Sequence, residues 1–138
     1  MCLTTKNREP NIAENNIVCY KILEKTEDEK YPYKTPYQYT PINKEIINGI
    51  HEFIGLGDRN NKQHFSTSIV ISEGYIHTFK FLPIAIEECK DRINIFGNKY
   101  CLYECIIPKC TKYYEGFDNQ IRTTYASEKI KFIKKINL

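Results

Sequence analysis

Cationic and aromatic side chains gather in the last third of the chain, just after its strongest apolar run. The residues concerned are Lys109, Lys112, Tyr113, Tyr114, Arg122 and Tyr125. Lysine and arginine attract an anion and tyrosine rings stack on a flat ligand, so this set could bind a planar anion such as a nucleotide. The same pattern is also typical of solvated turn lysines beside tyrosines that pack on a sheet. The sequence leaves both interpretations open.

No motif in the chain indicates catalysis. The three histidines, His51, His64 and His77, lie far apart, and the chain has neither a P-loop nor a Gly-x-Gly-x-x-Gly sequence. A cysteine or serine nucleophile needs a paired base and a third orienting group, and no motif supplies them. We therefore expect no catalytic residue, no metal site and no cofactor. Whether the chain is an enzyme stays open, and a non-enzymatic role is favoured.

The cysteines are expected to be free thiols. There is no Cys-x-x-Cys pair, and the spacing matches no zinc site. The first fourteen residues are polar and lack the apolar segment of a signal peptide, so we expect a reducing compartment. Cys101 and Cys105 fall on one face of a strand and suit a buried apolar position. The other four are Cys2, Cys19, Cys89 and Cys110.

Length and composition indicate one globular domain over residues 1–138. A chain of 138 residues can bury a real core, and a charged share of 27% is ordinary for such a domain. The net charge of +3 is too small to indicate nucleic acid. No apolar run approaches the roughly 20 residues that span a membrane, so neither a membrane nor nucleic acid is an expected partner. We expect a cytoplasmic location.

The residue pattern predicts an α+β fold, a mostly antiparallel sheet with one main helix packed on it. The helix is expected over about residues 82–95, because Leu82, Ala85, Ile86, Cys89 and Ile93 form one apolar stripe. Pro83 suits its first turn and Gly97 ends it. Strands are expected at 17–23, 65–71, 75–79, 100–107 and 130–136.

Other segments are expected to be irregular or peripheral. Residues 1–16 form an extended lead-in, and Phe117–Thr124 a polar connection. Tyr31–Tyr39 is a proline-punctuated long loop, or a loop with one short edge strand. Ile106, in the middle of the strongest apolar run, is expected to be fully buried. The lysines of the last strand predict a place at the sheet edge, where lysine discourages unwanted pairing.

Several short segments share their order with a known family. They include Val18–Leu23, Gly74–Phe79, Cys105-Ile106-Ile107-Pro108-Lys109, Tyr113-Tyr114-Glu115-Gly116 and Tyr125-Ala126-Ser127. The pattern resembles a family of small uncharacterised proteins from gut Bacteroidales and their phages, with the Ile-Pro-Lys…Tyr-Tyr block as its most specific part. Cys110 stands where that family usually has glycine. The resemblance covers most of the chain and implies an origin and a single fold, but no activity.

A second similarity is shorter. In ADP-ribosyltransferase-like domains a Gly-x-His/Tyr-x-Phe strand, a helix and a strand ending in a turn follow one another. Gly74–Phe79, the helix from Leu82 and Cys101–Lys109 have this order, and Phe65–Ser68 is similar to the Ser-Thr-Ser motif of that class. Fold analogy of this kind is a weak argument for activity.

Three functional hypotheses follow. The first is a non-enzymatic accessory protein of a phage or mobile element that binds a small anionic ligand or a host protein. The second is a structural or assembly component of a phage particle, held by contacts with phage proteins or with further copies of itself. The third is an ADP-ribosyltransferase-like domain. The first two place the chain in the host cytoplasm or in the phage particle.

Overall fold

The computed structural model describes residues 3–6, 9–36, 39–55, 62–64, 69–71 and 74–138. Strands dominate this part of the chain, and every strand pairing in it is antiparallel. The elements in chain order are β1 (Leu3–Thr5), β2 (Asn11–Ile12), β3 (Ile17–Lys25), β4 (Tyr33–Lys34), β5 (Pro41–Ile42), α1 (Lys44–Ile47), β6 (Phe53–Ile54), β7 (Lys62–His64), β8 (Ile69–Ile71), β9 (Ile76–Phe79), α2 (Leu82–Phe96), β10 (Tyr100–Ile107), β11 (Lys112–Phe117), β12 (Thr123–Ser127) and β13 (Lys129–Ile136).

The three longest strands form the centre of one half of the sheet. β10 lies between β3 and β13 and pairs with β3 along its whole length, with Cys105 opposite Cys19. All three strands are rich in β-branched and aromatic residues, which favour extended backbone. The strands expected at 17–23, 100–107 and 130–136 are therefore confirmed with small changes of bounds.

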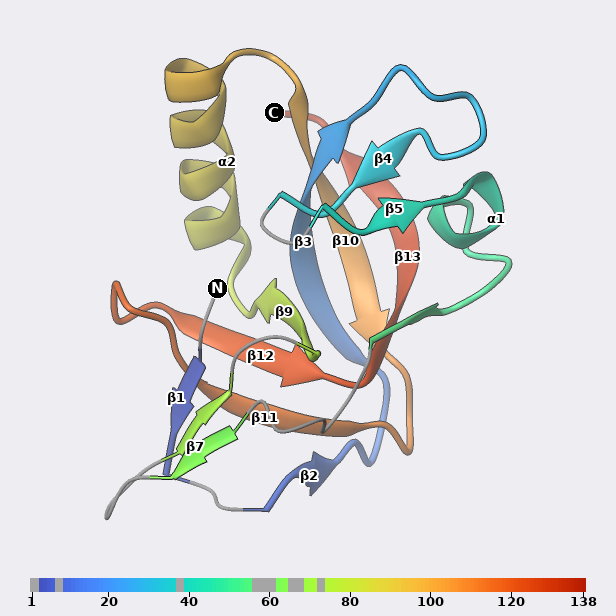
Figure 1. The fold of residues 1–138 in the computed structure, drawn as a ribbon. Helices are drawn as coiled ribbons and strands as arrows, with labels where there is room; N and C mark the ends of the chain where they lie inside the picture. Colours follow the sequence, from blue (N-terminus) through green and yellow to red (C-terminus); the bar gives the residue numbers. More distant parts are fainter. Residues whose placement is uncertain (1–2, 7–8, 37–38, 56–61, 65–68, 72–73) are drawn as a thin grey trace.

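The sheet turns into a half-barrel where β3 meets β9. The strand order runs β6-β13-β10-β3-β9-β12-β11-β1-β8-β7, and the sheet curves into a half-barrel. β3 and β9 share one residue pair, Tyr20 opposite Phe79, and then separate. Beyond this point β12 and β11 run across the direction of β3 and β10 (Figure 1). β3 and β9 are therefore adjacent in the strand order, but a gap separates them beyond this single residue pair.

The main helix lies where the apolar stripe predicts it. α2 packs on β3, β9 and β10, with Ala85 and Cys89 buried beneath it. Pro83 stands in its first turn, and Gly97 ends it with a φ of +102°, a backbone conformation that glycine adopts easily. No helix in the described part of the chain is long and apolar enough to span a membrane.

Ile106 is half-buried, so the expectation of full burial was wrong. Side chains alternate along β10, and the face that carries Cys105 and Ile107 points into the largest apolar cluster. Ile106 points to the opposite face. That face is covered by α2 only over the first half of β10, where Tyr100 and Leu102 are buried.

The polar connection predicted at Phe117–Thr124 joins two strands, β11 and β12, that overlap it only at its ends. β11 and β12 form a hairpin, with Tyr114 opposite Ala126 and Phe117 opposite Thr123.

The first and the last strand, β1 and β13, occupy different places in the sheet. Within the N-terminal segment, β1 pairs with both β11 and β8. In β13 the described partner β6 pairs only with Lys129 and Ile130, so the lysine-rich second half borders the sheet.

Candidate functional site

The structure does not gather the six residues of the predicted anion site on one surface. Lys109 and Lys112 are exposed beside the start of β11, as a turn site requires. Tyr114 is 0% exposed and packs edge-on against Tyr75, with ring centroids 5.7 Å apart. Tyr125 is also buried and packs against Tyr113. Neither buried ring can stack on a ligand from solvent.

Arg122 lies at the other end of the same hairpin. It follows Phe117 in the loop that joins β11 to β12, whereas Lys112 begins β11. Its guanidinium bonds Asp118 at 2.8 Å and Glu88 of α2 at 2.7 Å. Arg122 thus ties the hairpin to the helix and lies away from the two lysines.

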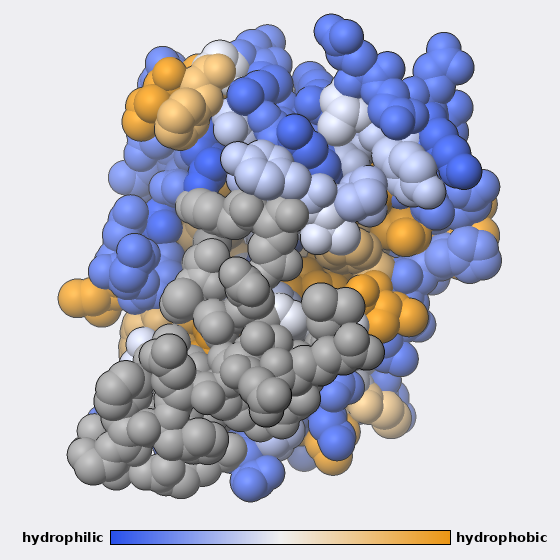
Figure 2. Space-filling model, in the orientation of Figure 1, coloured by the Kyte–Doolittle hydropathy of each residue, from blue (hydrophilic) through white to orange (hydrophobic). Residues whose placement is uncertain are grey.

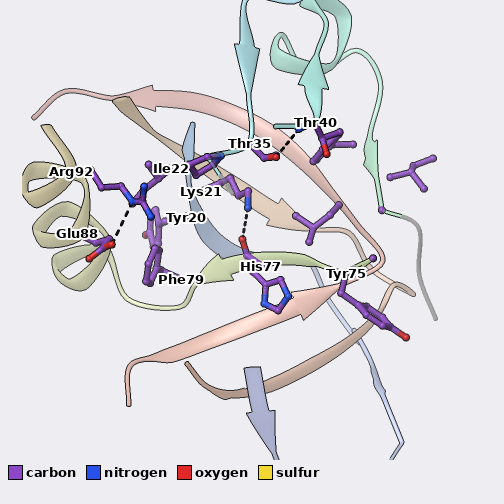
Figure 3. A pocket seen from close by; sticks show the side chains of 16 residues that line it. Tyr20, Lys21, Ile22, Thr35, Thr40, Tyr75, His77, Phe79, Glu88 and Arg92 are labelled. Atoms are coloured by element: carbon purple, nitrogen blue, oxygen red, sulfur yellow. Dashed lines mark hydrogen bonds and ion pairs between the residues drawn. The ribbon is translucent and has the colours of Figure 1, made fainter. Parts of the chain in front are cut away.

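A cavity of about 240 Å³ opens where β3 and β9 separate (Figure 3). Its lining comes from both sides of the sheet, because the opening passes between the two strands. Figure 2 shows apolar side chains exposed near the middle of this face of the molecule. The described residues that line it are Tyr20, Lys21, Ile22, Thr35, Pro36, Thr40, Phe53, Ile54, Gly55, Gly74, Tyr75, Ile76, His77, Phe79, Glu88 and Arg92.

Lys21 projects into the opening because of the alternation along β3. Cys19 and Leu23 point to the larger apolar cluster, and Lys21 lies between them on the same face. Its ammonium donates a hydrogen bond of 2.8 Å to the carbonyl oxygen of His77 in β9. The side chain therefore bridges the two strands at the point where their backbone ladder stops.

The pKa of Lys21 is lowered to about 8, mainly by burial and to a smaller extent by the positive charge of Arg92. An ammonium that has lost water favours a compensating negative charge. At neutral pH Lys21 is mainly protonated, so it offers an anion a charged hydrogen-bond donor among apolar walls. This is the strongest electrostatic feature of the cavity.

Two threonine hydroxyls border the cavity from the β4–β5 connection. The backbone N–H of Thr40 donates to Thr35 Oγ1 at 3.0 Å, and the N–H of Thr35 donates to the Thr40 carbonyl at 3.0 Å. These paired bonds hold the connection above Lys21, as Figure 3 shows. Because Thr35 Oγ1 accepts a bond here, its own hydroxyl hydrogen can be donated elsewhere.

An ion pair on α2 lines the other part of the cavity. Arg92 lies 3.4 Å from one oxygen of Glu88, whose second oxygen bonds Arg122. The lining thus carries two cations, Lys21 and Arg92, and one carboxylate, Glu88. The Glu88 charge is shared between two guanidinium groups, so the cavity as a whole favours an anion.

The remaining wall of the cavity is apolar, and the backbone segments at Gly55 and Gly74 approach each other closely there. Ile22, Phe53, Ile54, Ile76 and Phe79 supply most of its side chains. The wall closes where two glycines meet, and a Cβ added at Gly55 would lie only 2.5 Å from the carbonyl oxygen of Gly74. Gly74 itself has a φ of +92°. A larger residue at Gly55 would push the two segments apart.

The described residues show no group of three His, Cys, Asp or Glu side chains placed to hold a metal ion. His51 is exposed and His77 is buried in β9, on different parts of the fold. The side chain of His64 lies outside the described part. Among the described residues, the charged cavity is therefore the candidate site that we consider.

One feature of the sequence, a lysine inside an apolar strand, indicates this site. Lys21 interrupts the apolar strand Ile17-Val18-Cys19-Tyr20-Lys21-Ile22-Leu23, at an alternation position shared with Cys19 and Leu23. A lysine whose neighbours in the period-two pattern are buried must itself be buried or reach an opening. The partner strand and the opening could not be inferred, because His77 lies 56 residues away along the chain.

Comparison with protein-family models, curated proteins and solved structures finds no match.

Proposed function

We propose that the chain is a non-enzymatic protein that binds a small anionic ligand with an apolar body in the cavity around Lys21. The observation that carries this proposal is the half-buried ammonium of Lys21, which faces a largely apolar cavity and is bonded to one backbone carbonyl. An anionic group on the ligand would pair with Lys21, and its apolar body would contact Phe53, Ile54 and Ile76. The proposal keeps the ligand class expected from the sequence and moves the site from the β10–β11 turn to the β3–β9 opening.

Size limits the ligand. A cavity of about 240 Å³ lies just below the range of roughly 300–1,000 Å³ that is usual for drug-sized molecules. Small monocarboxylates with one ring or a short branched chain suit it, whereas a whole nucleotide would extend into solvent. Lys21 and Arg92 favour a ligand with a negative charge, whereas Phe53, Ile54 and Ile76 favour an apolar body.

Calorimetric titration with a panel of aliphatic and aromatic monocarboxylates, together with AMP, tests the proposal. We expect at least one monocarboxylate, such as 4-methylbenzoate, to bind more tightly than millimolar. The Lys21→Met variant should weaken this binding by about tenfold or more, the loss typical of a hydrogen bond to a charged group. Lys25→Met, which removes an exposed charge at the end of the same strand, is the matched control and should bind like the wild type.

The double variant Lys109→Ala with Lys112→Ala separates the two candidate sites. The Lys21 cavity predicts unchanged binding in this variant, because both lysines lie at the exposed β10–β11 turn. Loss of binding in the double variant, with unchanged binding in Lys21→Met, would return the site to the turn. Absence of binding by every carboxylate would remove the ligand hypothesis.

A role in assembly remains the second candidate, because one end of α2 exposes apolar side chains. Ile95 is 71% exposed and Phe96 58% exposed. Both lie in the last turn of α2, and Figure 2 shows an apolar patch over the upper end of this helix. Exposed patches of this kind often mark protein contacts. A sedimentation experiment that finds a defined oligomer in wild type and monomers in Ile95→Lys with Phe96→Lys would favour this role.

A further inference from the structure

Lys21 has the geometry of a nucleophile as well as that of a counter-charge. Among the sixteen described residues that line the cavity, it supplies the sole primary amine. Figure 3 shows its nitrogen between β3 and β9, within the ring of lining side chains. A primary amine enclosed by apolar walls is the arrangement that proteins use to attack carbonyl carbon.

The bond to His77 orients this amine. Lys21 Nζ donates one hydrogen to the His77 carbonyl oxygen at 2.8 Å. When the amine is neutral, its lone pair points away from that donated hydrogen. The bond thus holds the amine of Lys21 beside β9 and leaves its lone pair free to reach a bound ligand.

We infer that Lys21 forms a reversible imine with small ligands that carry an aldehyde or ketone beside their anionic group. This inference rests on the proposed ligand site and names the class of ligand that the site would hold covalently. Aromatic aldehyde acids and small 2-oxo acids belong to this class. Arg92 supplies a second positive charge in the lining for the carboxylate once Lys21 is committed to the carbonyl.

The reaction is a condensation without oxidation or reduction. The lone pair of Lys21 Nζ forms a bond to the carbonyl carbon, and the C=O π electrons move to oxygen, which takes up a proton. The nitrogen loses a proton to water, giving a neutral carbinolamine. The C–O bond then breaks with loss of water as nitrogen forms the C=N bond, and hydrolysis reverses the sequence.

The acidity of the ammonium supports the same step. With a pKa of about 8, roughly one-tenth of Lys21 is neutral at pH 7. A lysine with the usual pKa of about 10.4 has well under one-thousandth in that form. Lys21 is therefore expected to react before the exposed lysines, such as Lys25 and Lys112.

Reductive trapping tests the inference in the wild-type protein. The chain is incubated near pH 7 with 4-formylbenzoate and cyanoborohydride, which reduces the imine to a stable amine, and adducts are located by peptide mass spectrometry. We expect adduct formation at Lys21 on the order of tenfold or more faster than at Lys25. The preference should disappear in urea, where all lysines are exposed. An even distribution over the lysines of the folded protein would overturn the inference.

The isosteric 4-methylbenzoate distinguishes this inference from the proposed function. It has the same charge and nearly the same shape but no carbonyl. Binding of 4-methylbenzoate without a Lys21 adduct from 4-formylbenzoate refutes the imine and leaves the ligand site intact. Failure of 4-methylbenzoate to bind, together with no Lys21 adduct, refutes both. A selective Lys21 adduct supports the imine whatever the affinity for 4-methylbenzoate.

Two variants and the pH profile sharpen the test. Lys21→Arg keeps the positive charge and should still bind 4-methylbenzoate, but it should give no adduct at position 21. Lys25→Met should react like the wild type. As pH rises through about 8, binding of 4-methylbenzoate should weaken while the initial rate of adduct formation rises. If both change in the same direction, the amine does not act in its neutral form and the inference fails.

Discussion

Lys21 brings a positive charge into an apolar strand, and this placement has a cost in stability. Burial disfavours its ammonium and lowers its pKa to about 8, whereas the unfolded chain has the ordinary value near 10.4. Below pH 8 both states are protonated, and the folded state bears the full cost. Between about pH 8 and 10 the folded state loses its proton first, so the contribution of Lys21 to stability rises.

The first prediction follows from this rise in stability with pH. The free energy of unfolding of the wild type, minus that of Lys21→Met, should increase as pH rises from 7 to 10. Urea denaturation of both proteins over this pH range measures it. Taking the difference cancels the tyrosines and thiols that titrate in the same range, and Lys25→Met should show a flat difference. A flat or falling difference for Lys21→Met would mean that its ammonium is well solvated in the folded protein.

Neighbouring isoleucines of β10 provide the second prediction. Ile107 is 0% exposed within the largest apolar cluster, so Ile107→Ala should lower the free energy of unfolding by about 2–5 kcal/mol. Ile106 faces the other side, beyond the cover of α2, so Ile106→Ala should lose clearly less, about 1 kcal/mol. Chemical denaturation of the two variants compares them. Equal losses, or a larger loss at Ile106, would contradict the assigned faces of β10.

At the scale of elements, a chain of charges fastens the β11–β12 hairpin to α2. The Asp118 carboxylate is fully buried and bonds the guanidinium of Arg122, which also bonds Glu88 of the helix. Asp118 Oδ1 in addition accepts the backbone N–H groups of Gln120 and Arg122. Breaking such a buried pair on one side leaves an uncompensated charge.

The third prediction is that Arg122→Met lowers the free energy of unfolding by on the order of 3 kcal/mol, because Asp118 is left charged and buried. Adding Asp118→Asn should recover part of the loss, since the amide keeps an oxygen acceptor without the charge. The control is Lys80→Met, which breaks the partly exposed pair between Lys80, just after β9, and Glu115 of the same hairpin, and should cost less than about 1 kcal/mol. Urea denaturation of the single and double variants gives the coupling, and purely additive losses would exclude it.

The paired strands β3 and β10 carry the fourth prediction. Cys19 and Cys105 lie directly opposite each other, and burial raises the pKa of the Cys19 thiol to about 12. Buried thiols of high pKa react slowly, whereas Cys110 is exposed. Thiol counting should therefore find fast reaction at Cys110 in the native protein and all six thiols after unfolding without reductant. Fewer than five after unfolding would indicate a disulfide.

The sequence predicted those elements whose own residues determine them. The apolar stripe located α2, and dense β-branched and aromatic runs located β3, β10 and β13. β12 was missed because Thr123-Thr124-Tyr125-Ala126-Ser127 has little apolar character of its own. Thr124, Ala126 and Ser127 are buried all the same, since β9 and β11 enclose them on both sides. Such burial depends on tertiary neighbours rather than on local pattern.

The candidate site was harder to predict for a related reason. The cationic and aromatic types after Pro108 indicated ligand chemistry, but alternation along β11 and β12 buries Tyr114 and Tyr125. The cavity instead arises from the separation of β3 and β9, which are joined by a single residue pair. An opening between strands is a property of the assembled sheet, and residue types do not specify it.

At the scale of the whole molecule, the half-barrel explains why a cavity lies beside the main helix. The sheet changes direction at β9, with α2 on one side and the β4–β5 connection on the other (Figure 1). The place where the sheet opens is thus enclosed by the elements around it. Lys21 both closes the gap in the backbone ladder and gives the enclosed space its charge.

We propose that the chain binds a small anion at this opening and not at the β10–β11 turn. Proton–nitrogen correlation spectra of the labelled protein during titration with 4-methylbenzoate test it most directly. We expect the backbone signals of Lys21, Thr35, Thr40 and Gly55 to shift together and saturate, while those of Lys109 and Lys112 stay unchanged. Shifts confined to the turn around Lys109 and Lys112, or no shifts at millimolar ligand, would contradict it.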